Sequence, residues 1–248
     1  DIENLRKDTC PPVAVGILEA DSSPSSAILQ PDKRRDILRN IRFVQDDEAT
    51  AFVQDGDLKL RDLKGRNKLH VWQFPDTSQR ITNRYVVSFD PQKGTSDSAD
   101  YGVIKVFDRY WMMHGEGPEV VAMYYGRIDK DVTAWMAVQI AKWYNDAILV
   151  IESNTYDSES KEDGTEFIFN TIADYYSNLY SRTPADKIRE GAAVKYGFHT
   201  GATTKPMLIE HYTALIRERA YVERDAETLK TASQAPSRAS MTTVSCAR

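Results

Sequence analysis

The sequence is short of cysteine. Cys10 and Cys246 are the only two cysteines in 248 residues, and they lie near opposite ends without a C-x-x-C spacing. Neither a zinc knuckle nor the disulfide framework of a small secreted domain is indicated, so we expect a reducing compartment. A chain of this length can bury a substantial core as one large domain or two small ones.

Long apolar runs and targeting signals are also lacking. The longest apolar runs, such as residues 147–151, are far shorter than the roughly 20 residues needed to cross a bilayer. The N-terminus has neither the basic-then-apolar order of a secretory signal nor an initiator methionine, and we expect the chain to be a piece of a longer protein. No G-x-x-x-x-G-K-[ST] motif occurs, since the segment 201–206 lacks the second glycine, and we expect no ATPase motor here.

An excess of positive charge is the third absence. Lys and Arg number 32 against 37 Asp and Glu, which gives a net charge of −5. This balance argues against a protein that coats nucleic acid through bulk positive charge.

The two ends of the sequence show little periodic pattern. Residues 1–68 contain Pro11-Pro12 and a Ser/Pro-rich segment at 22–26, and we predict a partly irregular linker or satellite region. Within it, residues 32–42 predict a short charged helix, with either a solvated face or a basic face that contacts DNA. Residues 231–248 predict an irregular tail.

Between these ends, residues 69–230 show strong periodicity. Alternating and β-branched runs predict strands at 69–74, 85–90, 102–108, 119–125 and 147–152, and apolar stripes at i, i+3, i+4 spacing predict helices at 132–147, 164–180 and 204–219. This order predicts an α/β fold: a mixed sheet with a three-strand antiparallel meander plus a parallel crossover strand, flanked by helices.

Two carboxylates end the strongest predicted strands. Asp90 closes the run 85–90 and Glu152 closes the run 147–152. Ligands of open α/β sheets gather outside the carboxyl ends of neighbouring strands, so the pair predicts a site for a divalent cation with oxygen ligands, Mg²⁺ or Mn²⁺. Asp97 and Asp100, in the polar turn after Asp90, are further candidate ligands. The alternative for each acid is an ordinary cap on a turn.

Several short motifs, in order, resemble one known family. They are Val87–Pro91, Gly94, Asp100–Val103, Val150–Asn154, Tyr196–Thr200 and Thr204–Pro206 before a helix. In this order, over about residues 69–225, the chain resembles the C-terminal nuclease domain of bacteriophage terminase large subunits, which package viral DNA.

The resemblance implies a ribonuclease H-like fold and two-metal hydrolysis of double-stranded DNA. It implies that Asp90 and Glu152 bind two Mg²⁺ or Mn²⁺ ions, and that Lys205 lies near DNA. Lys93 and Lys195 are weaker candidates for phosphate contacts, and a solvated lysine is the alternative at Lys205. The implied partners are the terminase ATPase domain, small subunit and portal, and the implied location is the cytoplasm of the host cell.

The sequence departs from the family pattern at its end. The family completes its site with a late acid, usually in a His-Asp-Asp run, and residues 231–248 contain no acid. If the Ser240 codon ends in C and the Thr242 codon in G, a shifted reading frame over Ser240–Val244 encodes His-Asp-Asp. We therefore hypothesise a frameshift after about residue 227, which sequencing of the DNA tests, and expect weak or absent nuclease activity.

Three alternatives remain open from the sequence. A non-catalytic module that binds DNA or the portal would keep the fold without complete chemistry. Resolvases, transposases and other ribonuclease H-like nucleases also use paired carboxylates as metal ligands, so the fold does not distinguish them. Actin-like ATPases and sugar kinases begin with a similar strand and hairpin, but they need a duplicated domain that this length hardly accommodates.

Overall fold

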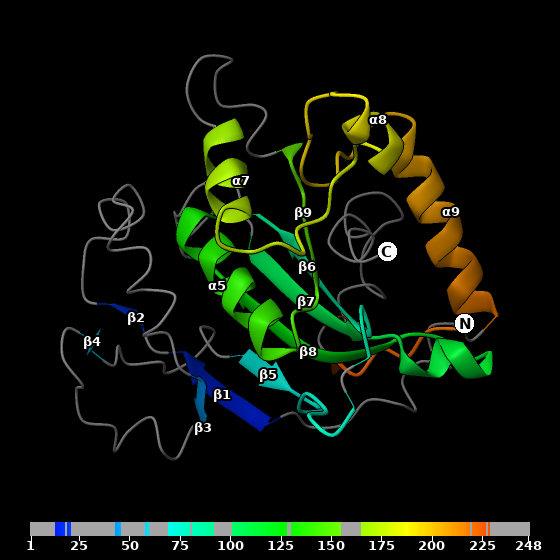
Figure 1. Cartoon of the computed structure of the whole chain (residues 1–248). Coiled ribbons are helices and arrows are strands. Elements are labelled where there is room, and N and C mark those ends of the chain that lie inside the picture. The colour runs from blue at the N-terminus through cyan, green and yellow to red at the C-terminus, as the bar shows by residue number, and fades with distance from the viewer. Residues whose placement is uncertain are drawn as a thin grey trace.

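The computed structural model describes residues 13–17, 19–20, 43–45, 58–59, 69–79, 81–91, 101–127, 130–154, 165–218, 220–226 and 228. Its elements are β1 (Val13–Ile17), β2 (Glu19–Ala20), β3 (Phe43–Gln45), β4 (Leu58–Lys59), β5 (Leu69–Val71), β6 (Tyr85–Asp90), β7 (Gly102–Asp108), η2 (Tyr110–His114), β8 (Glu119–Gly126), α5 (Lys130–Trp143), β9 (Ile148–Ile151), α7 (Thr165–Ala173), α8 (Ala185–Arg189) and α9 (Thr204–Arg217) (Figure 1). The helix predicted at 32–42 and the tail at 231–248 lie outside these residues.

A seven-stranded sheet has the order β3-β1-β5-β8-β7-β6-β9. Strands β6, β7 and β8 form the predicted antiparallel meander, and β9, which follows α5, pairs in parallel with β6. This order confirms the predicted mixed sheet, in which an antiparallel meander and a parallel crossover strand are flanked by helices. Strands β1 and β3 extend the sheet beyond β5, while β2 and β4 pair separately. The boundary at residue 68 stays a prediction.

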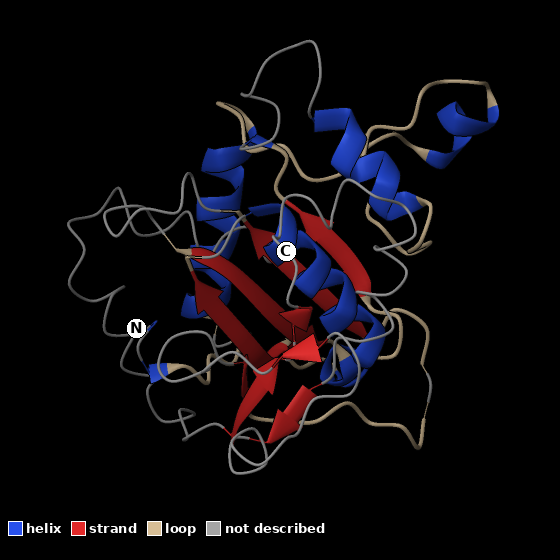
Figure 2. Cartoon of the chain, turned by 90° about the vertical axis from the view of Figure 1, so that its left-hand side faces the viewer, coloured by secondary structure: helices blue, strands red, loops and turns tan. Residues whose placement is uncertain are grey.

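Helices α5 and α7 cover one face of the sheet. Alternate residues of β6 and β9 point into this core, among them Val87, Phe89, Leu149 and Ile151, each with no exposed surface. β-branched and aromatic side chains favour strands because they pack well on a pleated surface, and full burial of each contributes about 1.5–3 kcal/mol. Figure 2 shows helices on two sides of the strands.

The opposite face of the sheet is covered at one end by α9. Phe107 and Val120 pack there against Tyr212 of α9 and Tyr221, with Val86 of β6 beside them. Because β6 alternates, Val86, Ser88 and Asp90 share this face. The end of this face that carries Asp90 is therefore the place for a polar site.

The elements differ from the predicted ones mainly at their ends. Helix α7 ends at Ala173 rather than near residue 180, because the chain turns back along β9: the N–H of Leu149 donates to the Asn178 carbonyl oxygen, and that of Tyr180 to the Leu149 carbonyl oxygen. The first predicted strand ends at Val71 instead of residue 74. No helix among the described residues combines the length and apolarity that crossing a membrane requires.

Candidate active site

Asp90 and Glu152 lie side by side at one end of two neighbouring parallel strands. Asp90 is the last residue of β6, and Glu152 directly follows β9. The register pairs Phe89 with Ile151, and the N–H of Glu152 donates to the Phe89 carbonyl oxygen at 2.9 Å. Asp90 and Glu152 are the next residues in that register, on strands roughly 4.8 Å apart, so their side chains share one face.

Glu152 is a mostly buried residue with no counter-charge among the described residues. It is 7% exposed, and among the described residues its side chain has no hydrogen-bond or ion-pair partner. Removing an isolated carboxylate from water costs several kcal/mol unless a cation or hydrogen bonds compensate. A cation between Glu152 and the half-buried Asp90 would offset that cost.

The donor set fits a hard divalent cation. Mg²⁺ in proteins is usually held by one or two carboxylates together with waters and substrate phosphates, and two carboxylates are present here. The other sequence-predicted ligands, Asp97 and Asp100, lie outside the described residues, as does Lys93. Within the described part of the chain, no group of three or more His, Cys, Asp or Glu side chains could hold a metal ion.

The segment that leads into α9 is fastened to the chain just after Glu152. Phe198 pairs with Glu152 in a parallel bridge, and the N–H of Ser153 donates to the Phe198 carbonyl oxygen at 2.8 Å. Asn154 then exchanges two hydrogen bonds with the backbone of Thr200, at 2.5 and 2.9 Å. The chain around Thr200 is therefore held beside the carboxylate pair.

Lys205 lies in the first turn of α9, directly after this fastened segment. The Thr204 hydroxyl donates to the His199 carbonyl oxygen at 3.0 Å and accepts from the N–H of Gly201 at 2.7 Å. Lys205 itself is half-buried, and its N–H donates to the Gly201 carbonyl oxygen. The local bonds thus bring the start of α9 close to the chain that follows Glu152.

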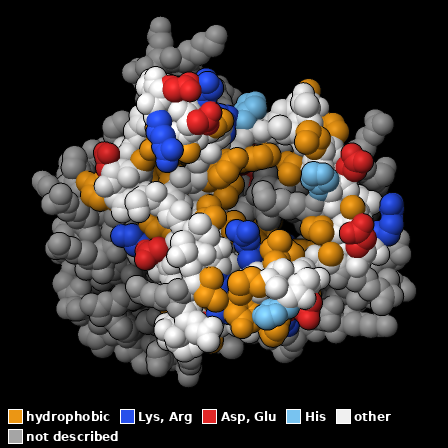
Figure 3. Space-filling view, turned by 45° about the vertical axis from the view of Figure 1, so that its right-hand side comes forward, with side chains coloured by type: hydrophobic (Ala, Val, Ile, Leu, Met, Phe, Trp, Pro, Cys, Tyr) orange, Lys and Arg blue, Asp and Glu red, His pale blue; other side chains and the backbone are white. Residues whose placement is uncertain are grey.

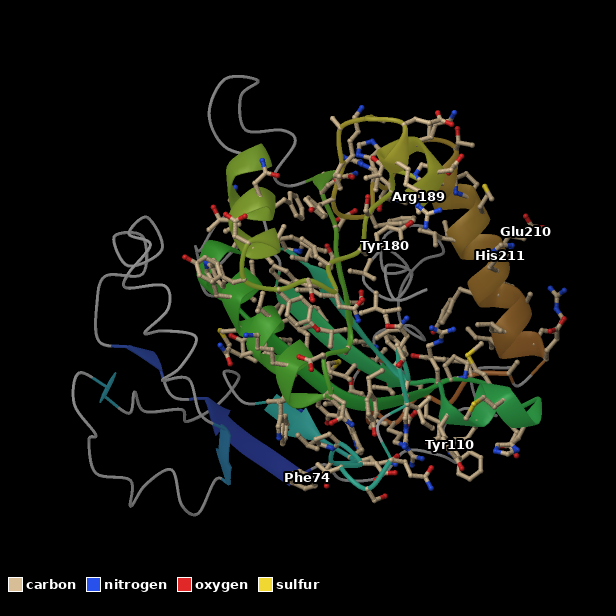
Figure 4. The ribbon with its side chains drawn as sticks, viewed as in Figure 1. Phe74, Tyr110, Tyr180, Arg189, Glu210 and His211 are labelled. Atoms are coloured by element: carbon tan, nitrogen blue, oxygen red, sulfur yellow. The ribbon has the colours of Figure 1, made fainter. Side chains whose placement is uncertain are left out.

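Lys195 is placed farther along the same segment. Its side chain is exposed, while its N–H donates to the Thr183 hydroxyl at 2.8 Å and its carbonyl oxygen accepts from the N–H of Arg182. Figure 4 shows Tyr180 and Arg189 on this part of the chain, and Glu210 and His211 projecting from the outer side of α9, away from the sheet. In the view of Figure 3 the described charged side chains are of both signs and form no single basic patch.

Three charged residues on the site face were not singled out from the sequence. Lys105 of β7 is buried in an ion pair with Glu223, and Asp225 accepts hydrogen bonds from the N–H and hydroxyl of Thr228. The sequence did carry signals for them. Lys105 is the one cation in the otherwise apolar run 102–107, and Asp-x-x-Thr before Leu229 is a helix N-cap pattern.

A second buried charge cluster lies at the opposite end of β6. Arg84 precedes β6 and forms a bidentate ion pair with Asp108, which ends β7, at 2.8 and 3.0 Å. Its third bond, at 2.9 Å, goes to Asp76. The hydrogen bonds that Arg84 donates to Asp108 raise the pKa of Arg84 above its ordinary value, and the guanidinium lies over the Tyr110 ring at 4.7 Å. This cluster of paired charges stabilises the fold.

Comparisons with known proteins identify similar structures only. No protein-family model matches the chain, and no curated protein matches it. The large terminase nuclease from thermophilic phage G20c is similar at a TM-score of 0.43 and 15% identity, over 67% of this chain and 69% of that one. Its magnesium-bound structure gives the same TM-score and identity over 67% and 68%. Its zinc-bound structure gives 0.46 and 13% over 74% and 87%. At these identities the likeness concerns the fold alone.

Proposed function

We propose that this chain is the DNA endonuclease module of a phage packaging terminase. It hydrolyses phosphodiester bonds with Mg²⁺ or Mn²⁺ held by Asp90 and Glu152. The single observation that carries the proposal is that Glu152, 7% exposed and without a side-chain partner among the described residues, lies next to Asp90 in the β6–β9 register. Neighbouring carboxylates repel each other, and a cation bound between them would relieve that repulsion.

The proposed chemistry divides among the chain's own residues. Asp90 is half-buried at the strand end, next to Glu152 in the register, and this position suits a ligand shared between two ions. Bound divalent ions would activate the attacking water and neutralise charge on the leaving oxygen. Lys205, in the first turn of α9, would contact a phosphate of the DNA backbone. Lys195 and Lys93 would add weaker phosphate contacts, and Asp97 or Asp100 a further ligand.

The proposed metal site of this chain lacks one acidic ligand. The late acid expected from the resemblance is missing from residues 231–248, so the second ion would bind poorly and cleavage would be slow. Double-stranded DNA is the proposed substrate. The ATPase domain, small subunit and portal of the packaging machine are the proposed partners, in the cytoplasm of the host cell.

Mn²⁺ titration by calorimetry, with plasmid cleavage in parallel, tests the proposal. The unaltered chain should bind at least one Mn²⁺ ion, and Asp90→Asn and Glu152→Gln should each raise the Kd at least tenfold. Glu210→Gln makes the same charge change on the exposed side of α9 and should leave the Kd unchanged. No Mn²⁺ binding, or equal binding by all three variants, contradicts the proposal.

A non-catalytic module that binds DNA is the second candidate function. It is favoured because, within the described ranges, no group of three His, Cys, Asp or Glu side chains could hold a metal ion. Retention of DNA without any dependence on Mn²⁺, and without cleavage, distinguishes it from the nuclease.

A further inference from the structure

A buried ion pair shares the sheet face with Asp90, and the proposed chemistry does not use it. Lys105 Nζ donates to Glu223 Oε2 at 2.9 Å, and the two side chains are 3% and 0% exposed. Lys105 is directly opposite Ser88 in the β6–β7 register, while Asp90 is opposite Val103. Lys105 is therefore a diagonal neighbour of Asp90 across the β6–β7 pair, and such neighbours lie about 7–8 Å apart.

Glu223 is fixed by donors from its own segment of chain. The Tyr221 hydroxyl donates to Glu223 Oε2 at 2.7 Å, and the N–H of Asp225 donates to Oε1 at 3.0 Å. The Tyr221 ring packs in turn against Phe107 in the cluster beneath α9. A carboxylate held by these two donors offers Lys105 a partner in one defined place.

We propose that Glu223 is a positioning residue for the carboxylate pair: it keeps the Lys105 ammonium engaged, so that Lys105 does not compete with a divalent cation for Asp90. This inference rests on the proposed metal site. A lysine ammonium is a compact charge on a flexible stem, and a buried one requires a counter-anion. Without the charge of Glu223, Lys105 turns to Asp90 one diagonal step away and competes with the metal for it.

The segment that carries Glu223 has a second, independent anchor, which supplies a matched control. Arg224 donates to Glu119 Oε2 of β8 at 2.8 Å, and the N–H of Val120 donates to the Val222 carbonyl oxygen. Glu119→Gln therefore loosens the same segment by one ion pair without releasing Lys105. This control distinguishes an effect of loosening the segment from an effect of removing the charge that pairs with Lys105.

The test measures Mn²⁺ affinity by calorimetry in the full chain, with thermal unfolding followed alongside. Glu223→Gln, which keeps the shape of the side chain, should raise the Kd about tenfold. The double variant Lys105→Met with Glu223→Gln should return it to within twofold of the unaltered chain, because the competing ammonium is gone. Glu119→Gln should leave it unchanged. If Glu223→Gln does not fold, Tyr221→Phe carries the test, since it removes one donor to Glu223 but keeps the ring, and should raise the Kd about twofold.

Each contrary result has a distinct meaning. An unchanged Kd in the folded Glu223→Gln variant, as when Lys105 turns to Asp225 instead, overturns the inference. Equal weakening in Glu223→Gln and in the double variant also overturns it, because the effect would then come from anchoring of the segment. Absence of Mn²⁺ binding in the unaltered chain overturns the proposed function itself, and this inference with it.

Discussion

Asn154 and Thr200 hold two distant segments together by exchanging two hydrogen bonds between one side-chain amide and one residue's backbone. The Asn154 amide donates to the Thr200 carbonyl oxygen, and its oxygen accepts from the Thr200 N–H. The residues are 46 positions apart, and they join the end of β9 to the segment that starts α9. This link sets where Lys205 lies relative to Glu152.

Replacing Asn154 by alanine should therefore weaken both DNA binding and the folded state. Loss of two hydrogen bonds should cost about 1–3 kcal/mol of unfolding free energy. DNA affinity in filter binding should fall about fivefold, because the start of α9 is no longer held in place. Asn178→Ala removes an exposed amide that donates to the Asp146 carbonyl oxygen, and DNA affinity should be unaffected. Equal affinities for all three proteins would show that the link does not position a DNA contact.

Gly197 occupies a place where a side chain cannot be accommodated. Its φ is +76°, and a Cβ would lie 2.8 Å from the Ile151 carbonyl oxygen and 2.9 Å from Phe169 Cζ. Gly197→Ala should lower the unfolding free energy by about 3 kcal/mol and weaken Mn²⁺ binding, because the adjacent Phe198 pairs with Glu152.

Gly191→Ala is the matched control for this change. Gly191 has a φ of +91°, but nothing lies within 4 Å of an added Cβ, so only the backbone term of about 1–2 kcal/mol should appear. Chemical denaturation of both variants measures the difference. Equal losses of unfolding free energy in Gly197→Ala and Gly191→Ala would show that the close approach of Gly197 to Ile151 does not affect stability.

The ion pair between Arg84 and Asp108 should matter for stability and not for metal binding. Asp108→Ala leaves a buried guanidinium without its main partner, which should cost about 3–5 kcal/mol in urea denaturation. Glu190→Ala breaks the exposed pair with Lys187 and should cost about 0.5 kcal/mol or less. Mn²⁺ affinity of the folded Asp108→Ala protein should be unchanged, because Asp108 lies at the other end of β6 from Asp90. A large loss of affinity would contradict this separation.

Asp76 should contribute to stability in a pH-dependent way. Hydrogen bonds from Ser78 and Arg84 lower the pKa of Asp76 from 3.8 to about 2. Since the folded state holds the proton less tightly than the unfolded state, the contribution is complete above about pH 4 and is lost as pH falls through about 2. Thermal unfolding of the unaltered chain and Asp76→Asn should therefore differ by a constant amount near neutral pH, and the difference should shrink below pH 4. If the difference in thermal stability between the two proteins grew as the pH fell, the pKa of Asp76 would be raised by folding rather than lowered, and the prediction would be wrong.

The strands of the meander and the crossover strand could be predicted because their residues have one dominant local preference. The runs 85–90 and 102–108 combine β-branched and aromatic residues, and they form β6 and β7 with the predicted bounds. The end of α7 could not be predicted from its apolar stripe. Tyr176 and Leu179 fit the helical spacing, but the chain there pairs alongside β9 instead. A short-range pattern does not reveal a competing partner on a distant strand.

The sequence by itself determined the mixed fold and the two strand-end acids, since alternation and strand length are local properties that survive without tertiary contacts. Only the tertiary structure decided that Asp90 and Glu152 occupy one register, because that depends on β9 pairing in parallel with β6 rather than elsewhere in the sheet. The tertiary structure also decided that Lys105 is buried in an ion pair. Its partner Glu223 is 118 residues away, and burial of both charges together is a consequence of packing that no local pattern encodes.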